Sequence, residues 1–219
     1  VIFSDVSTDV LEYAQSLAQQ MKVLSRCRFV LAPADDLSQI DASSVDAVTT
    51  RSVLIYVSAK QQAFNEFHRV LKPRGRLSIF EPIGRYAHPE PASTFAGYGI
   101  GPVVEIAQKL KALYDRIQPP EVDPMIDFDE RDLVVFAERA GFEEIHVELQ
   151  IDVSSTMEKT TWERFLHSAS NPKVPTLDEA MQQALAPEEA NTFTAHLRPL
   201  VEQGHGTRKS ALAYLWATK

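Results

Sequence analysis

The sequence predicts an α/β fold built on a doubly wound, mostly parallel sheet, and three observations lead to that class. Short apolar runs bounded by polar residues are typical of inner strands, and stretches with helical periodicity separate them. This alternation of strands and helices over the first eighty or so residues favours right-handed βαβ units. Between residues 82 and 102 the alternation stops, and four prolines and four glycines indicate an irregular insertion.

Six segments have the pattern of strands. Four of them are short apolar runs in the first half of the chain, a fifth alternates apolar with polar residues as a half-buried strand does, and the last is almost continuously apolar. In chain order we expect strands at residues 1–3, 28–31, 45–48, 77–80, 145–153 and 211–216.

Six further segments have helical periodicity. Ser7 is placed to cap the first helix, whose predicted buried face comprises Val10, Leu11, Ala14, Leu17, Ala18 and Met21. Ser58 with Gln61, and Asp127 with Glu130, have the spacing of a capping residue and its partner three positions later. The predicted helices cover residues 8–21, 59–71, 104–117, 128–140, 162–169 and 188–203, and Gly141 is the expected residue at the end of the fourth.

Composition excludes several classes of protein. The chain of 219 residues carries a net charge of −8, which argues against nucleic acid as its main partner. Its single cysteine excludes an internal disulfide and a cysteine zinc site, and its six histidines include no pair at metal-binding spacing, so we expect no metal. No apolar run approaches the length of about 18 residues that suggests a membrane span. We therefore expect a soluble, cytoplasmic protein.

Two acidic sites lie where ligands bind in open α/β sheets, at the carboxyl ends of strands. Asp5 ends the first predicted strand, where a carboxylate commonly accepts hydrogen bonds from ribose hydroxyls; the alternative is a helix cap. Asp35 and Asp36 follow the second predicted strand, and there the alternative is a solvated acidic loop. The residues alone leave both alternatives open.

Four longer segments agree in order and spacing with one known family: VIFSDVSTDVLEYA, APADDLSQIDASSVDAV, RSVLIYVSAKQQAFNEFHRVLKPRGRLSIFEP and ERAGFEEIHVEL. The chain resembles class I S-adenosylmethionine-dependent methyltransferases, of the type that includes the ubiquinone and menaquinone biosynthesis methyltransferases. The most specific part is RVLKPRGRL, in which Pro73 and Gly75 are expected to form a turn between a helix and a strand. The resemblance covers roughly residues 1–153.

The resemblance implies a Rossmann-like, doubly wound sheet with an antiparallel last strand and an inserted helical lid. A single methyltransferase domain is expected, with its core at residues 1–81 and 127–219 and the lid at residues 82–126. The family's first strand and Gly-rich loop would precede Asp5 by about 20 residues. Residues 1–74 contain no glycine. We therefore expect the N-terminal part of the domain to lie outside this chain.

The resemblance also assigns a cofactor, S-adenosylmethionine, and its contacts. Asp5 matches the residue that holds the ribose hydroxyls, with Val6 beside it, and Ala34 and Asp35 match the segment along the adenine. The methionine part is expected to lie against Thr50, Arg51 and Ser52. Neither pattern nor resemblance identifies a catalytic base. Candidates for contact with the methyl acceptor are Tyr56, Glu81, Arg85, Tyr86, His88 and Tyr98. For Glu81, which ends a predicted strand, the alternative is a cap of the next turn.

The function implied is methyl transfer to an unidentified small-molecule acceptor, without nucleic acid or membrane as partner; self-association is left open. One alternative is a non-catalytic binding or scaffold protein derived from a methyltransferase, which a true absence of the Gly-rich loop would favour. A nicotinamide-dependent oxidoreductase would also use an acidic residue at Asp5. However, it leaves the RVLKPRGRL segment unexplained.

Overall fold

The computed structural model describes all 219 residues, and the chain forms two compact units. The core unit comprises Val1–Ile83, Phe128–Leu149 and Leu212–Lys219, and the helical unit comprises Gly84–Asp127 and Gln150–Ala211. The helical unit begins at Gly84, and residues 150–211, which the sequence predicts as part of the core, lie in this unit instead. Their helices bury apolar side chains in a common cluster with residues of the insertion.

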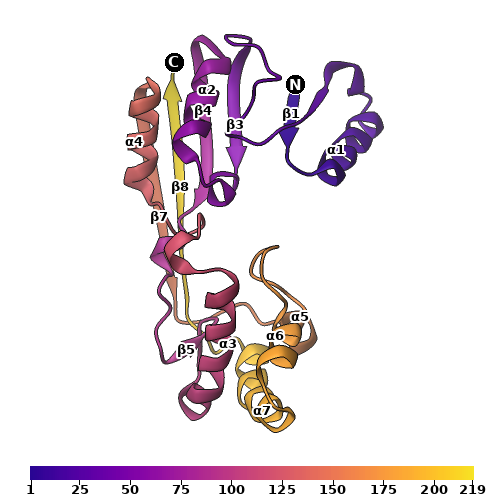
Figure 1. Cartoon of the computed structure of the whole chain (residues 1–219), viewed down its shortest axis with the longest axis vertical. Coiled ribbons are helices and arrows are strands. Elements are labelled where there is room, and N and C mark those ends of the chain that lie inside the picture. The colour runs from indigo at the N-terminus through magenta and orange to yellow at the C-terminus, as the bar shows by residue number, and fades with distance from the viewer. The chain divides into compact units, whose positions relative to one another are not determined.

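The strands of the core unit form two sheets. A small parallel sheet pairs β1 with β2, and a larger sheet has the order β3-β4-β8-β7, in which β4 is parallel to β3 and antiparallel to β8 (Figure 1). The α/β class and the antiparallel last strand agree with the prediction, whereas one continuous, mostly parallel sheet does not form. The strand bounds are Ile2–Asp5 for β1, Arg28–Leu31 for β2, Val45–Arg51 for β3, Leu71–Pro82 for β4, Glu143–Ser154 for β7 and Arg208–Thr218 for β8.

Three helices belong to the core unit: α1 (Thr8–Gln20), α2 (Lys60–Val70) and α4 (Glu130–Ala140). Helices α2 and α4 pack against each other, and α1 packs against β1 and β2. The predicted buried face of α1 is only partly correct, because Leu11 and Ala18 are buried whereas Val10, Leu17 and Met21 are exposed. A two-stranded sheet covers only a narrow stripe of a helix, so the outer part of the apolar stripe stays in solvent.

The helix caps differ from prediction at two helices. The N-cap of α2 is Ala59, with no side-chain hydrogen bond, so the Ser58 and Gln61 capping box does not form. At α4 the capping box lies two residues later than predicted: Asp129 accepts from the backbone N–H of Asp132, whose carboxylate accepts from the N–H of Asp129. Helix α4 ends at Gly141 in the left-handed conformation, as predicted.

The RVLKPRGRL segment is a bulge in β4 rather than a turn before it. Leu71 pairs with Val45, but the next pair joins Arg76 to Ala47, so the intervening residues of β4 loop out. The left-handed residue of this bulge is Arg74, with φ of 65°. Gly75 is required for close approach, since a Cβ there would lie 2.8 Å from both the Leu71 Cδ2 atom and the Lys72 carbonyl oxygen.

The helical unit contains α3 (Val104–Ile117), α5 (Trp162–Leu166), α6 (Leu177–Ala184), α7 (Pro187–Gln203) and a short hairpin of β5 (Thr94–Phe95) and β6 (Tyr98–Gly99). Its core is lined from all of these elements, and its most deeply buried members include Tyr98, Ile100, Leu110, Phe193 and Leu197. Helix α6 was not predicted; a capping box between Thr176 and Glu179 starts it. No helix of the chain is long and apolar enough to cross a membrane.

The loop between β2 and β3 is held by two charged residues of α2. One Glu66 carboxylate oxygen accepts from the Leu37 N–H at 2.7 Å, and Arg69 donates to the carbonyl oxygens of Leu37 and Ile40 at 2.7 and 2.9 Å. The two side chains also bond each other. The hydrogen bond from Arg69 lowers the pKa of Glu66, with further help from the Leu37 N–H. This pair therefore fixes the loop that follows Ala34 and Asp35.

Replacing Glu66 with Gln should lower the free energy of unfolding at pH 7 by about 2 kcal/mol, the scale of hydrogen bonds to a charged group. Because the folded-state pKa is lowered, this contribution is present above the unfolded-state pKa of Glu and is lost as pH falls through the folded-state value. Urea unfolding at pH 7 and in mild acid measures both effects. The exposed Glu12, changed to Gln, is the control, and a pH-independent deficit in the Glu66 variant would contradict this prediction.

Candidate functional site

The carboxyl ends of β1 and β2 bring the predicted ribose and adenine residues to one edge. Asp5 pairs with Leu31 in the parallel register, and the Ala32 N–H donates to the Asp5 carbonyl oxygen at 3.0 Å. The loop that carries Ala34 and Asp35 begins directly after this pair. The parallel register thus makes Asp5 and this loop neighbours at the edge where ligands bind in open α/β sheets.

The Asp5 carboxylate keeps one oxygen free of hydrogen bonds within the chain. Its Oδ1 atom accepts from the Ser7 N–H at 2.8 Å, and no donor of the chain bonds Oδ2. The cap of α1 is Ser7, whose hydroxyl accepts from the Val10 N–H, so Asp5 is not the helix cap. Val6, next to it, is 72% exposed. A half-buried carboxylate with an unused oxygen at this edge suits a ligand that donates hydroxyl hydrogen bonds.

The end of β3 carries a second polar group without a partner. Thr50 pairs with Ile79 in the sheet, and its hydroxyl oxygen is buried and makes no hydrogen bond. Leaving a buried hydroxyl unpaired costs about 1–3 kcal/mol. Next in the chain, Arg51 lies over the ring of Phe80 at 5.1 Å, and Ser52 adopts a left-handed conformation with φ of 54°. Strained backbone and an unpaired hydroxyl at the end of a strand are features of ligand sites.

Glu81, at the carboxyl end of β4, organises the segment that follows Ser52. Its side chain is fully buried, and its two oxygens accept from the N–H groups of Val53, Leu54 and Ile55 at 2.9, 2.9 and 3.3 Å. These residues start the 3₁₀ turn η2 (Leu54–Tyr56). Burial raises the pKa of Glu81, while the three N–H donors oppose that shift. Of the two sequence interpretations of Glu81, the contacts favour the cap of a turn over contact with substrate.

The remaining acceptor-side candidates are divided between the two units. Tyr56 ends η2 in the core unit and is 42% exposed, while Arg85, Tyr86 and His88 are exposed residues of the helical unit. Tyr98 is only 1% exposed and packs edge-on against Phe165. The ring of Tyr98 thus belongs to the core of the helical unit, and this burial argues against the predicted contact with the methyl acceptor. The chain also holds no cluster of three His, Cys, Asp or Glu side chains suited to a metal.

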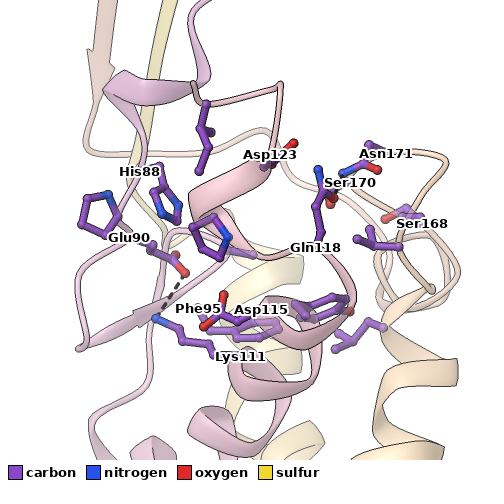
Figure 2. Close-up of a pocket in the computed structure, with 18 of the residues that line it drawn as sticks. His88, Glu90, Phe95, Lys111, Asp115, Gln118, Asp123, Ser168, Ser170 and Asn171 are labelled. Carbon is purple, nitrogen blue, oxygen red and sulfur yellow. Dashed lines mark hydrogen bonds and ion pairs between the residues drawn. The ribbon is translucent and has the colours of Figure 1, made fainter. Parts of the chain in front are cut away.

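Sequence reasoning missed a cavity of about 610 Å³ in the helical unit (Figure 2). Of the predicted site residues only His88 lines it. Its walls come from four separate stretches of chain, around residues 88–96, 111–126, 165–171 and 174–177. No motif links these stretches, and α6, which contributes Leu177, was not predicted. Only the packing of the helical unit reveals this cavity.

Comparison with known proteins finds a family match for the part of the chain that contains β1 to β3 and most of β4. Residues 1–79 match the family model described as a methyltransferase domain. Over these residues the chain is similar to that family. The match spans Asp5, Ala34, Asp35, Thr50 and Ser52, so the unpartnered carboxylate and hydroxyl oxygens lie within the family segment. The resemblance to class I S-adenosylmethionine-dependent methyltransferases is thereby confirmed at the level of the domain.

Individual relatives are distant and are matched over part of their length. The chain is 28% identical over 153 residues to the ubiquinone/menaquinone biosynthesis C-methyltransferase UbiE of Haemophilus ducreyi, covering 67% of this chain and 56% of that relative. A 64-residue segment is 38% identical to the human thiol S-methyltransferase TMT1B, covering 27% of this chain and 26% of the human protein. The chain thus spans little more than half the length of these curated relatives at most.

Solved structures show the same fold. The whole chain superimposes on 82% of a putative methyltransferase from Bacillus halodurans, with a TM-score of 0.54 and 15% identity. It also superimposes on 65% of the [4+2]-cyclase SpnF, with a TM-score of 0.51 and 19% identity. These likenesses establish an α/β methyltransferase fold. Since one of these proteins is described as a cyclase, the fold by itself does not determine the reaction.

Replacing Glu81 with Ala should lower the free energy of unfolding by about 3 kcal/mol or more, because three N–H groups lose their acceptor. Amide hydrogen exchange at Val53, Leu54 and Ile55 should accelerate more than exchange in α4. Glu81→Gln is the matched control, since its amide oxygen can still accept from two of these groups and should lose about 1 kcal/mol. Unchanged protection in the Ala variant would show that the turn holds without the carboxylate.

Proposed function

We propose that the protein containing this chain transfers a methyl group from S-adenosylmethionine to a small-molecule acceptor. The observation that carries the proposal is a pair of unused polar groups, the Asp5 carboxylate oxygen and the Thr50 hydroxyl, at the carboxyl ends of β1 and β3. Both lie within the residues that match the methyltransferase domain. Ligands of open α/β sheets bind at this edge.

The residues of the chain would mainly bind and orient the cofactor. When bound, S-adenosylmethionine supplies an electrophilic methyl group on its sulfonium. Asp5 would accept hydrogen bonds from the ribose hydroxyls, Ala34 and Asp35 would hold the adenine, and the Thr50 hydroxyl and Ser52 would hold the methionine part. Glu81 acts on the site indirectly, because it holds the turn that follows Ser52. Holding donor and nucleophile in line can supply several kcal/mol of the barrier to transfer.

The competing functions make different demands on the same edge. A nicotinamide enzyme would use Asp5 in the same way, but the family match covers the whole segment through β4 to Ile79 and favours a methyl donor. A non-catalytic relative would bind S-adenosylmethionine and its demethylated product without turnover. The cyclase of the same fold is the precedent for a different reaction on this scaffold.

The sheet topology supports a further proposal about completeness of the site. Strand β1 is bonded only to β2, and β3 only to β4, so each presents an unpaired edge. We propose that one more parallel strand of the native protein, ending in a Gly-rich loop, pairs with these edges and completes the cofactor cradle. The resemblance to the family supports this proposal, since its members carry such a strand and loop before the residue that matches Asp5.

Changing Asp5 to Asn should weaken binding of S-adenosylmethionine by roughly tenfold or more, because a charged acceptor contributes about 1.5–3 kcal/mol to its hydrogen bonds. Calorimetric titration of the intact protein measures the effect. The control is Asp46→Asn at the opposite end of β3, where the carboxylate pairs with Lys72. If wild type and the Asp5 variant bind S-adenosylmethionine equally well, the predicted contact of Asp5 with the ribose is wrong. Binding of NADH without binding of S-adenosylmethionine would favour the oxidoreductase.

A chain extended at its N-terminus by a strand and a Gly-rich loop should bind S-adenosylmethionine at least tenfold more tightly than residues 1–219. The physical reason is that only glycine lets a backbone approach the cofactor closely, and residues 1–74 hold none. Titrating both forms side by side tests this expectation. If residues 1–219 bind as tightly as the extended form, the proposed strand is not part of the cofactor site.

A further inference from the structure

The cavity of the helical unit combines an aromatic wall with an acidic rim. Phe95, Tyr114 and Phe165 form the aromatic side. The ring centroids of Phe95 and Tyr114 are separated by 6.4 Å. Burial raises the pKa of the Tyr114 hydroxyl, and the nearby Glu179 carboxylate adds to the shift, so this wall is uncharged at neutral pH. A volume of about 610 Å³ is in the range of sites for small organic molecules.

The charges that line the cavity do not cancel. Glu90 is neutralised by Lys111, whose ammonium lies 3.3 Å from one of its carboxylate oxygens, as the dashed line in Figure 2 shows. Lys111 also donates to the Pro91 carbonyl oxygen. Asp115 and Asp123 have no cationic partner in the chain, and no other Lys or Arg lines the cavity. The cavity therefore presents two uncompensated carboxylates.

Asp123 is the group whose surroundings point most directly to a ligand. Its residue is only 9% exposed, yet it lines the cavity. The Met125 N–H donates to its Oδ1 atom at 3.0 Å, and no group of the chain bonds its Oδ2 atom. The Oδ2 atom is not among the buried side-chain atoms that lack a partner, so it is accessible at the cavity wall. A cation or hydrogen-bond donor in the cavity can therefore bind it.

The neighbouring amide does not supply the missing donor. The Asn171 Nδ2 group donates to the Gln118 Oε1 atom at 3.1 Å, while the Gln118 Nε2 group is buried and makes no hydrogen bond. Gln118 and Asn171 lie on the same rim as Asp123 in Figure 2. Asp123 thus sits among side chains that leave its free oxygen available.

We propose that this cavity binds an organic ammonium ion carried on an apolar or aromatic body. The ammonium group donates to the free oxygen of Asp123, Asp115 adds an attractive charge, and the body packs between Phe95, Tyr114 and Phe165. Aromatic faces and carboxylates together favour cations over neutral or anionic groups. Reading this amine as the methyl acceptor rests on the proposed function, whereas its binding to the cavity does not.

Three probes of one shape separate charge from apolar burial: 2-naphthylmethylammonium, 2-naphthalenemethanol and 2-naphthoate. Each is titrated calorimetrically into the full chain at neutral pH and physiological salt, without cofactor. The ammonium probe should bind about tenfold more tightly than the alcohol, and naphthoate should bind most weakly. If the alcohol matches the ammonium probe, or naphthoate binds best, the proposal is wrong.

Variants then assign the preference to the cavity. Asp123→Asn keeps an acceptor for the Met125 N–H and should reduce the advantage of the ammonium probe to about threefold or less. Asp115→Asn, at an exposed position where folding is not at stake, should reduce it by a smaller factor. Asp152→Asn, an exposed carboxylate of β7 outside the cavity, is the matched control and should leave it unchanged. An equal loss in the Asp152 variant would reveal general attraction of cations to an acidic protein and overturn the site.

A parallel titration with S-adenosylmethionine keeps this proposal distinct from the proposed function. Asp123→Asn should leave cofactor affinity unchanged, and Asp5→Asn should leave affinity for the ammonium probe unchanged. A wild-type protein that binds the ammonium probe but no cofactor would retain the cavity site and contradict methyl transfer. Cofactor binding without any preference among the three probes would agree with the proposed function and would overturn the ammonium site in the cavity.

Discussion

The buried carboxylate of Glu81 is the interaction on which the candidate cofactor site depends. It is the penultimate residue of β4, the strand that pairs with β3 on one edge and with β8 on the other. A carboxylate buried at this depth requires hydrogen-bond donors, and the three N–H groups of residues 53–55 provide them. The backbone after Ser52 is thereby held to the end of β4, which places the exposed Tyr56 at the end of a fixed turn. The Lys60 ammonium donates to the Val57 carbonyl oxygen of this segment at 2.9 Å. It also lies 4.7 Å from the ring centroid of Phe128.

A similar constraint acts on the loop between β2 and β3. This loop has no regular structure of its own, and its backbone groups are satisfied by Glu66 and Arg69 from α2. In both places a charged side chain from a rigid element fixes a segment that carries a predicted ligand contact. Hydrogen bonds from these side chains to backbone groups thus maintain the geometry of the site, whereas one Asp5 carboxylate oxygen and the buried Thr50 hydroxyl make no such bond. That contrast is the physical basis for assigning them to a ligand.

The two units carry separate parts of the proposed chemistry. The core unit holds the residues that match a methyltransferase domain, and the helical unit holds a cavity whose lining is acidic and aromatic. A methyl donor is recognised through its ribose and adenine, which the strand ends of an α/β sheet suit well. The ammonium ligand that we propose for the cavity would be recognised by shape and charge, and these depend on helices whose sequences carry no motif. Relatives in this fold can therefore share a cofactor and differ in the reaction that they perform.

The sequence by itself determined the α/β class, the position of Asp5 at a strand end and the family of residues 1–79, because periodicity and an ordered set of motifs are local properties. It also predicted the left-handed cap at Gly141. It could not determine that residues 150–211 join the insertion, that Tyr98 is buried, or that Glu81 caps a turn almost thirty residues earlier in the chain. Each of these outcomes arises from contacts between segments distant in sequence. The cavity around Asp123 is the clearest case, since four stretches of chain form it and only their packing leaves one carboxylate oxygen without a partner.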